Sequence, residues 1–188
     1  MEVIDALCPV GPIASRLNSD GPKDLIATSD ANEVDVPMVV LANSGTSAGA
    51  ELLAVSVRDF GKGRIVGTTT AGKGSIQCDP VRLSNGAAVS YTIGMLLTGK
   101  EESFDGTGVS PDVEISLKAE EERNFYDLTP DTDSQIQKAV ETAGALLNST
   151  SSQTSGDSAA SSSAAESVSE PAPESVSEPE SASASAAE

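Results

Sequence analysis

Apolar and polar positions along the first part of the chain follow two patterns that predict a strand and a helix. Residues 37–42 form a continuous apolar run between turn-formers, typical of a central parallel strand buried on both faces. Over 48–60 the apolar side chains recur at helical spacing, and Gly61 supplies a natural stop. A second short strand is expected at 64–67. The order strand, helix, strand predicts an α/β layer with a right-handed crossover.

Further extended segments are predicted on either side of this layer. A short strand is expected at 12–15, and the polar stretch 18–33 that follows has no assigned element. The runs 75–83 and 87–94 are joined by Asn85-Gly86, a dipeptide that favours tight hairpin turns. These runs are therefore predicted to form a β-hairpin.

The last part of the chain changes from a helical pattern to a low-complexity one. Thr129-Pro130-Asp131 offers an N-cap, a first-turn proline and an acid, so a closing helix is expected over residues 130–147. Residues 148–188 contain seven acids, no Lys or Arg, and mostly Ser, Ala and Pro. Such a segment cannot bury enough apolar surface to offset its chain entropy. We therefore expect an ordered region over 1–147 and a disordered acidic tail over 148–188.

Charge and composition exclude several classes of function. The net charge is −18 for the whole chain, and −11 remains on residues 1–147 once the seven acids of the tail are set aside. Nucleic acid is therefore not an expected partner, because its phosphates would be repelled. No apolar run approaches the roughly 20 residues that span a bilayer. Acids stand near Met1 where an export signal needs basic residues, so no signal is visible and the location is left open.

The absence of histidine restricts the available chemistry further. Without His there is no Ser-His-Asp triad, no His-ligated metal and no imidazole base, so a hydrolytic base must be Lys, Asp or Glu. Cys8 and Cys78 are too few for a four-Cys zinc site and leave at most one disulfide. No metal or other cofactor is predicted.

Three loops carry candidate chemistry, each beside a plainer interpretation. The turn 45–51 brings backbone N–H groups to a helix N-terminus, where they could stabilise an oxyanion, or it is an ordinary strand-to-helix turn. Lys73 lies between two glycines and could act as a base, because removal from water lowers a lysine pKa, or it is a solvated loop lysine. The segment 106–112 is expected to be a turn before a strand.

Taken in order, these motifs resemble the C-terminal processing peptidases, also called tail-specific proteases, which use a Ser/Lys dyad. The matching segments within 37–115 are 39–43, 45–51, 66–68, 72–77, 83–86 and 106–112. The resemblance implies an α/β fold with a crotonase and Clp-protease type core of strand-helix units, present here in part. It further implies serine-type hydrolysis of polypeptide substrates, with Lys73 as general base and Gln77 orienting it.

One departure from the family pattern falls on the nucleophile. Twenty-five positions before Lys73, where the family has serine, stands Ala48, and the preceding residue is Ser47. Alanine has no oxygen with which to attack a carbonyl. Ser47 is the candidate displaced nucleophile, although an offset of one residue turns a side chain by about 100° on a helix. Backbone N–H groups from Gly45 to Gly49 are the expected oxyanion donors.

Three functional hypotheses stay open at this point. The chain is an active endopeptidase through Ser47, an inactive relative that binds an extended peptide along a strand edge, or a truncated gene remnant. The family is typically extracytoplasmic and carries a PDZ domain and a first half of the core ahead of this region. Whether another chain supplies that half or Met1 is a misplaced start is left open by the sequence.

Overall fold

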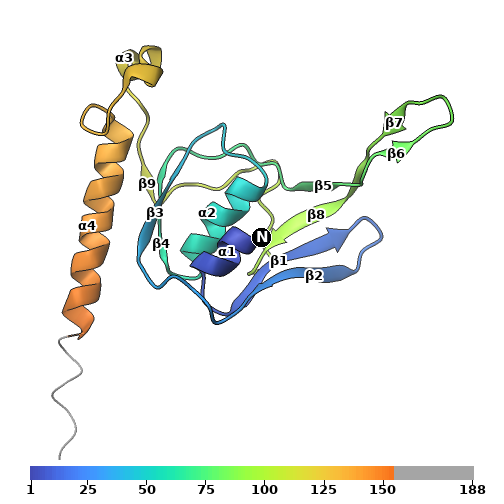
Figure 1. Ribbon diagram of the computed structural model, residues 1–188, viewed down its shortest axis with the longest axis horizontal. Coiled ribbons are helices and arrows are strands. Elements are labelled where there is room, and N and C mark those ends of the chain that lie inside the picture. The colour runs from blue at the N-terminus through green and yellow to red at the C-terminus, as the bar shows by residue number, and fades with distance from the viewer. Residues whose placement is uncertain (155–188) are drawn as a thin grey trace, which may run out of the picture.

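A three-stranded parallel sheet lies at the centre of the fold. The computed structural model describes residues 1–154. The sheet order is β3 (Met38–Ala42), β4 (Gly63–Gly67) and β9 (Val113–Glu114). Helix α2 (Gly49–Asp59) joins β3 to β4 and packs against both, and α4 (Ser134–Thr154) packs on the same strands from the other side (Figure 1). The predicted strand-helix-strand layer is therefore confirmed.

A four-stranded antiparallel sheet lies beside this layer. Its order is β2 (Lys23–Ser29), β1 (Gly11–Asn18), β8 (Thr92–Thr98) and β5 (Ser75–Gln77). Beyond this sheet, the chain that leaves β5 and the chain that leads into β8 pair with each other as β6 (Val81–Arg82) and β7 (Ala88–Val89). They form the projecting arm of Figure 1. At the tip of the arm Gly86 takes φ +86°, a conformation that glycine adopts without steric cost. The predicted hairpin is confirmed, whereas β2 lies in the polar stretch that had no assigned element.

The hydrophobic core fixes α2 against both sheets and against α1 (Glu2–Leu7). Its buried members include Cys8, Ile13, Leu52, Ile65 and Phe104. Each large apolar side chain buried in this way contributes about 1.5–3 kcal/mol to folding. Because Leu52 lies in the first turn of α2, the core also fixes the start of that helix. The turn that precedes α2 is thereby attached to a rigid base.

The position of β3 differs from the prediction. The apolar run predicts a central strand buried on both faces, but β4 is central among residues 1–154 and β3 is an edge strand. Leu41 on β3 is accordingly 45% exposed. A run of apolar residues indicates that a strand can be buried, but the partners on either side are set by distant segments.

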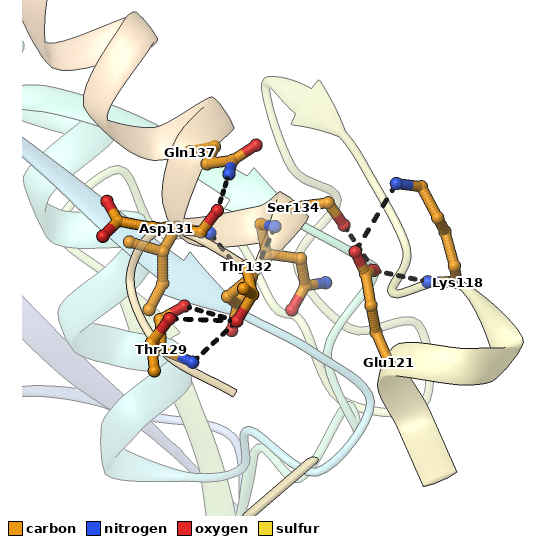
Figure 2. A network of polar contacts seen from close by, with 10 residues as sticks. Lys118, Glu121, Thr129, Asp131, Thr132, Ser134 and Gln137 are labelled. Carbon is orange, nitrogen blue, oxygen red and sulfur yellow. Dashed lines mark hydrogen bonds and ion pairs between the residues drawn. The ribbon is translucent and has the colours of Figure 1, made fainter. Parts of the chain in front are cut away.

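Helix α4 begins later and ends later than its pattern predicts. The residue that caps it is Asp133, whose Oδ1 accepts the backbone N–H groups of Gln135 (2.8 Å) and Ile136 (3.0 Å). Thr129, the predicted cap, instead closes a turn with Thr132 (Figure 2). The helix continues to Thr154, beyond the expected domain boundary at 147. The disorder expected for the rest of the tail falls on residues outside the described part of the chain.

The acidic run 120–122 is not a uniformly solvated face. It lies on α3 (Ala119–Arg123), which the sequence patterns did not predict, and which leads into a 3-10 turn, η1 (Phe125–Asp127). Glu121 Oε2 accepts the backbone N–H of Lys118 (2.8 Å) and the hydroxyl of Ser134 (2.7 Å), as Figure 2 shows. Glu121 therefore holds α3 against the first turn of α4, while its two acidic neighbours are exposed.

Cys8 is buried and Cys78 is half-buried, and both are free thiols, so the one disulfide that the sequence allowed is absent. None of the helices within residues 1–154 is long and apolar enough to cross a membrane.

Candidate active site

The turn between β3 and α2 holds Ala48 in a conformation that is unusual for an L-amino acid. Ala48 has φ +53° and ψ −117°, a combination that non-glycine residues adopt only when their surroundings impose it. Two side-chain contacts shape the preceding loop: Asn43 Oδ1 accepts the N–H of Gly45 (2.9 Å), and Thr46 Oγ1 accepts the N–H of Asn43 (3.0 Å). Helix α2 starts at Gly49, directly after the strained residue. The turn therefore presents residue 48 at a helix N-terminus.

The carboxylate of Glu51 joins this turn to the loop that carries Lys73. Glu51 is fully buried. Its Oε2 accepts the backbone N–H groups of Ala48 (2.9 Å) and Lys73 (2.8 Å). Its Oε1 accepts the N–H of Gly72 (2.7 Å) and the hydroxyl of Thr70. The two loops approach closely because their N–H groups share one oxygen. Ala48 offers no side-chain acceptor in return, so only the glutamate half of a capping box is present.

Glu51 is ionised at neutral pH. Burial alone would raise its pKa, because a buried charge loses its hydration. The hydrogen bonds from Thr70, Lys73, Gly72 and Ala48 outweigh burial and hold the pKa of Glu51 below its ordinary value. The negative charge also lies in the first turn of α2, where the helix dipole favours it.

The loop 68–74 is supported by the glycine-rich segment that follows β8. Gly106 donates its N–H to the carbonyl of Gly72 (2.9 Å). Gly72 and Gly108 have φ +74° and +73°, and a Cβ on Gly72 would lie 2.8 Å from the backbone nitrogen of Gly108. The segment expected to be a plain turn does precede a strand, but it also holds the backbone that carries Lys73.

The side chains of the expected dyad are less constrained than the backbone beneath them. Lys73 is exposed, and within residues 1–154 its side chain makes no hydrogen bond or ion pair. Gln77, expected to orient Lys73, instead donates from Nε2 to the hydroxyls of Thr92 (2.8 Å) and Ser75 (3.4 Å). Ser47 is half-buried, one residue before the strained position. The dyad roles of these residues therefore stay predictions.

The two expected oxyanion donors differ in availability. The N–H of Gly45 is occupied by Asn43 Oδ1. The N–H of Gly49, the first of α2, makes no hydrogen bond within the described residues. A free N–H at a helix N-terminus can stabilise a developing oxyanion. Next to it, residue 48 has no oxygen that could attack.

Two hollows open side by side at the carboxyl end of the parallel sheet. The larger, of about 420 Å³, includes Gly45 and Glu122 in its lining. The smaller, of about 260 Å³, includes Phe125. Asn43 and Gln135 line both hollows, so the two are adjacent.

A parallel strand, a strained turn, a helix N-terminus and a lysine loop tied to that turn make up the candidate site of an α/β core. Residues 1–115 match the family model described as Peptidase family S41. Because this match covers more than half of the chain, the protein belongs to peptidase family S41. The resemblance drawn from the sequence motifs is therefore confirmed.

Relatives and solved structures agree with this assignment. The chain is 38% identical over 107 residues to the chloroplastic C-terminal processing peptidase of Tetradesmus obliquus, a match that covers 56% of this chain and 23% of that protein. It is 30% identical over 133 residues to the carboxyl-terminal-processing protease of Synechocystis sp., covering 71% and 30%. A structure of a photosystem II D1 C-terminal processing protease superposes with a TM-score of 0.56 at 36% identity, covering 61% and 30%. The chain thus spans less than a third of the length of these relatives.

Glu51 is the residue of the site whose role the sequence reasoning missed. In the sequence it belongs to the matching segment 45–51, and the motif alone assigns it no function. The spacing of a glutamate three residues after a helix-capping position is the available signal, because such a glutamate bonds back to the cap N–H. Its contacts to the lysine loop have no local signal, since residues 70–73 are distant in sequence.

Proposed function

We propose that this protein is a member of peptidase family S41 that binds an extended polypeptide without cleaving it. The observation that carries the proposal is the turn at Ala48. The strained backbone, the buried carboxylate behind it and the adjacent lysine loop are all present, while the residue they surround has no oxygen. A serine peptidase needs a hydroxyl at that point to form its covalent intermediate.

Ser47 is a poor substitute for the missing hydroxyl. Its carbonyl accepts the N–H of Ala50 (3.2 Å), so its backbone is already engaged with the first turn of α2. Its side chain is attached one residue before residue 48, the position at the start of α2 where the nucleophile is expected. A displacement of about 1 Å in a reacting atom can lower a rate about a hundredfold. These points favour binding over turnover.

The free edge of β5 is the surface we propose for the peptide. Within residues 1–154, β5 pairs only with β8, so its other edge carries unpaired backbone groups. The strand begins at Ser75, only two residues after Lys73, and this closeness along the chain supports the choice of that edge. An added strand would gain main-chain hydrogen bonds without requiring a particular sequence.

Turnover and binding are measured together to test this proposal. The wild-type chain, Ser47→Ala, Ala48→Ser and the double variant Ala48→Ser/Lys73→Ala are incubated with a reduced, alkylated unstructured protein. Cleavage is followed by mass spectrometry, retention on the immobilised substrate reports binding, and a thermal melt of each variant reports folding. We expect the wild type to bind without cleavage, Ala48→Ser to cleave, and the double variant to lose that cleavage.

Two outcomes would contradict the proposal. Cleavage by the wild type that is lost in Ser47→Ala would identify Ser47 as a working nucleophile and the chain as an active peptidase. Failure of the folded wild-type chain to retain the substrate would exclude a peptide-binding role.

A further inference from the structure

The larger of the two hollows lies where the three parallel strands end. We call it the sheet-end cleft and define it by Asn43, Gly45, Thr68, Ser116, Glu122 and Gln135. Asn43 and Thr68 directly follow β3 and β4, and Ser116 follows β9 after one intervening residue. Open α/β sheets bind their ligands at this end of their strands. Gly45 also belongs to the loop that leads to Ala48, so the cleft opens beside the candidate active site.

Well-defined contacts hold the wall of the cleft that α3 and α4 provide. Glu121 joins α3 to Ser134 at the start of α4 (Figure 2). Gln135 Nε2 donates to the carbonyl of Ile115 (2.8 Å), which anchors the first turn of α4 to the segment after β9. Asp133 caps the same turn. The backbone of this wall is therefore held in place, and so is the side chain of Gln135.

The charge of the cleft has one sign. Glu122 is the only ionisable residue in its lining, and its carboxylate has no ion-pair partner within residues 1–154. The surrounding segment 116–133 carries six acidic residues and two basic ones, Lys118 and Arg123, and Lys118 is paired with Glu121. A concave surface lined by one sign of charge concentrates ligands of the opposite sign. The cleft therefore favours a cationic group.

The neighbouring hollow offers apolar contacts instead. Leu41 and Ile136 line it together with Phe125. Phe125 is 52% exposed, so its ring is accessible to a ligand in the hollow. Because Asn43 and Gln135 line both hollows, a single bound chain can reach the two at once. Burial of an aliphatic side chain against Phe125 would remove apolar surface from water on both partners.

We infer that the sheet-end cleft and its apolar neighbour together select a peptide that carries a Lys or Arg side chain two residues away from an aliphatic one. Alternate side chains of an extended chain point the same way and are about 6.5–7 Å apart. Glu122 pairs with the basic side chain, and Phe125 contacts the aliphatic one. This inference rests on the proposed peptide-binding function and names the chemistry of the peptide.

Matched peptides and matched variants test the inference on the full chain. Three fluorescein-labelled peptides of one Gly/Ser frame carry Lys-Ser-Leu, Glu-Ser-Leu or Lys-Ser-Ser at the centre, and fluorescence anisotropy gives each Kd. We expect the wild type to bind Lys-Ser-Leu about two- to fivefold more tightly than Glu-Ser-Leu, the range expected of an exposed ion pair. Added salt should reduce that preference.

The variants distinguish the effect of the cleft on binding from the effect of the protein's overall negative charge. Glu122→Gln should abolish the preference for Lys over Glu, while Glu120→Gln, an exposed acid on the same helix outside the cleft lining, should leave it unchanged. Phe125→Ala should abolish the preference for Leu over Ser. Tyr91→Ala, the control, removes an aromatic ring that is 58% exposed and lines neither hollow, and it should leave that preference unchanged. Equal effects of Glu122→Gln and Glu120→Gln, or no preference in the wild type, would overturn the inference.

The two proposals fail in different ways. If Ala48→Ser cleaves an unstructured substrate but none of the peptides is preferred, the sheet-end cleft is not a selecting site and the proposed function stands. If Glu122 governs binding of Lys-Ser-Leu while Ser47 proves to be a working nucleophile, the cleft is a selecting site and the non-cleaving function is wrong.

Discussion

Residue 48 combines an unfavourable backbone with favourable contacts around it. The left-handed φ of +53° at an alanine costs about 1–3 kcal/mol compared with a relaxed conformation. The hydrogen bond from its N–H to the buried Glu51 and the packing of α2 maintain the conformation. At this scale the site is defined more by backbone geometry than by reactive side chains.

Ala48→Gly should therefore stabilise the protein by about 0.5–1 kcal/mol, because glycine adopts positive φ without the Cβ clash. Urea denaturation measures the change. Ala50→Gly, at an exposed position in the first turn of the same helix, is the matched control and should destabilise by about 0.5–1 kcal/mol. Loss of stability in Ala48→Gly similar to that in Ala50→Gly would show that residue 48 is not strained.

Glu51→Gln should destabilise the protein by about 2–3 kcal/mol. The amide nitrogen of glutamine cannot accept hydrogen bonds, so the N–H groups that face it would lose their partner. Glu120→Gln, which is exposed, should change stability by less than about 0.5 kcal/mol. Chemical denaturation at neutral pH compares the two. A cost in Glu51→Gln as small as that of the exposed control would mean that the four hydrogen bonds to Glu51 contribute little.

The same residue predicts a pH dependence. Because the pKa of Glu51 is lower in the folded protein than its ordinary value of 4.5, its contribution is present above pH 4.5 and is lost as the pH falls through the lower, folded value. Unfolding free energies between neutral pH and about pH 3 should fall less steeply in Glu51→Gln than in the wild type. Parallel pH profiles would contradict the depressed pKa.

Between elements, the site depends on the contact of two glycine-containing loops. The loop 68–74 and the segment 106–109 approach so closely that a Cβ on one would meet the backbone of the other. Glycine is therefore required at Gly72 and Gly108, where a Cβ would meet the facing backbone. Within loop 68–74, the backbone of Lys73 is fixed by its hydrogen bond to Glu51, while its side chain is exposed.

Gly108→Ala and Gly106→Ala should differ in cost for this reason. Both glycines have nearly the same positive φ, +73° and +74°, but a Cβ on Gly108 would clash with the carbonyl of Thr70 whereas one on Gly106 meets nothing within 4 Å. We expect about 1 kcal/mol for Gly106→Ala and at least about 2–3 kcal/mol for Gly108→Ala, measured by thermal or urea unfolding. Equal costs would mean that the loops do not touch.

Across the whole molecule, the single core beneath α1 and α2 makes the two sheets one folding unit. Cys8 lies in that core, whereas Cys78 lies at the base of the projecting arm. Burial raises the pKa of the Cys8 thiol; Lys62 nearby acts to lower it and Glu33 to raise it. Thiol reactivity needs both a thiolate and access, so the two cysteines report on different parts of the fold.

A thiol reagent should therefore modify Cys78 rapidly and Cys8 at least about a thousandfold more slowly, because Cys8 becomes accessible only when the core opens. Cys8→Ser and Cys78→Ser assign the two phases. Denaturant should accelerate the slow phase alone. Similar rates for both thiols would show that α1 does not cover the core in solution.

Local patterns in the sequence predicted the elements whose partners lie near them along the chain. The strand-helix-strand layer and the hairpin at Asn85-Gly86 follow from periodicity and turn chemistry, which act within a few residues. The strand β2 carries only a weak signal, because its apolar residues 25–27 are a short run inside a polar stretch and most of its side chains are exposed. The start of α4 was misplaced because Thr129 and Asp133 both suit a cap, and only the packing of α3 against Ser134 distinguishes them.

What the sequence by itself determined is chemical identity: the absence of histidine, the order of the family motifs, and an alanine at residue 48, the position that the motif spacing predicts for the nucleophile. These facts depend on which atoms are present and not on where they lie. Only the tertiary structure decided that Glu51 joins the turn at Ala48 to the loop at Lys73, that Gly49 keeps a free N–H, and that Glu122 faces a cleft. The contact of Glu51 with the lysine loop and the lining of the cleft join segments far apart in the chain, which packing brings together and no local pattern encodes.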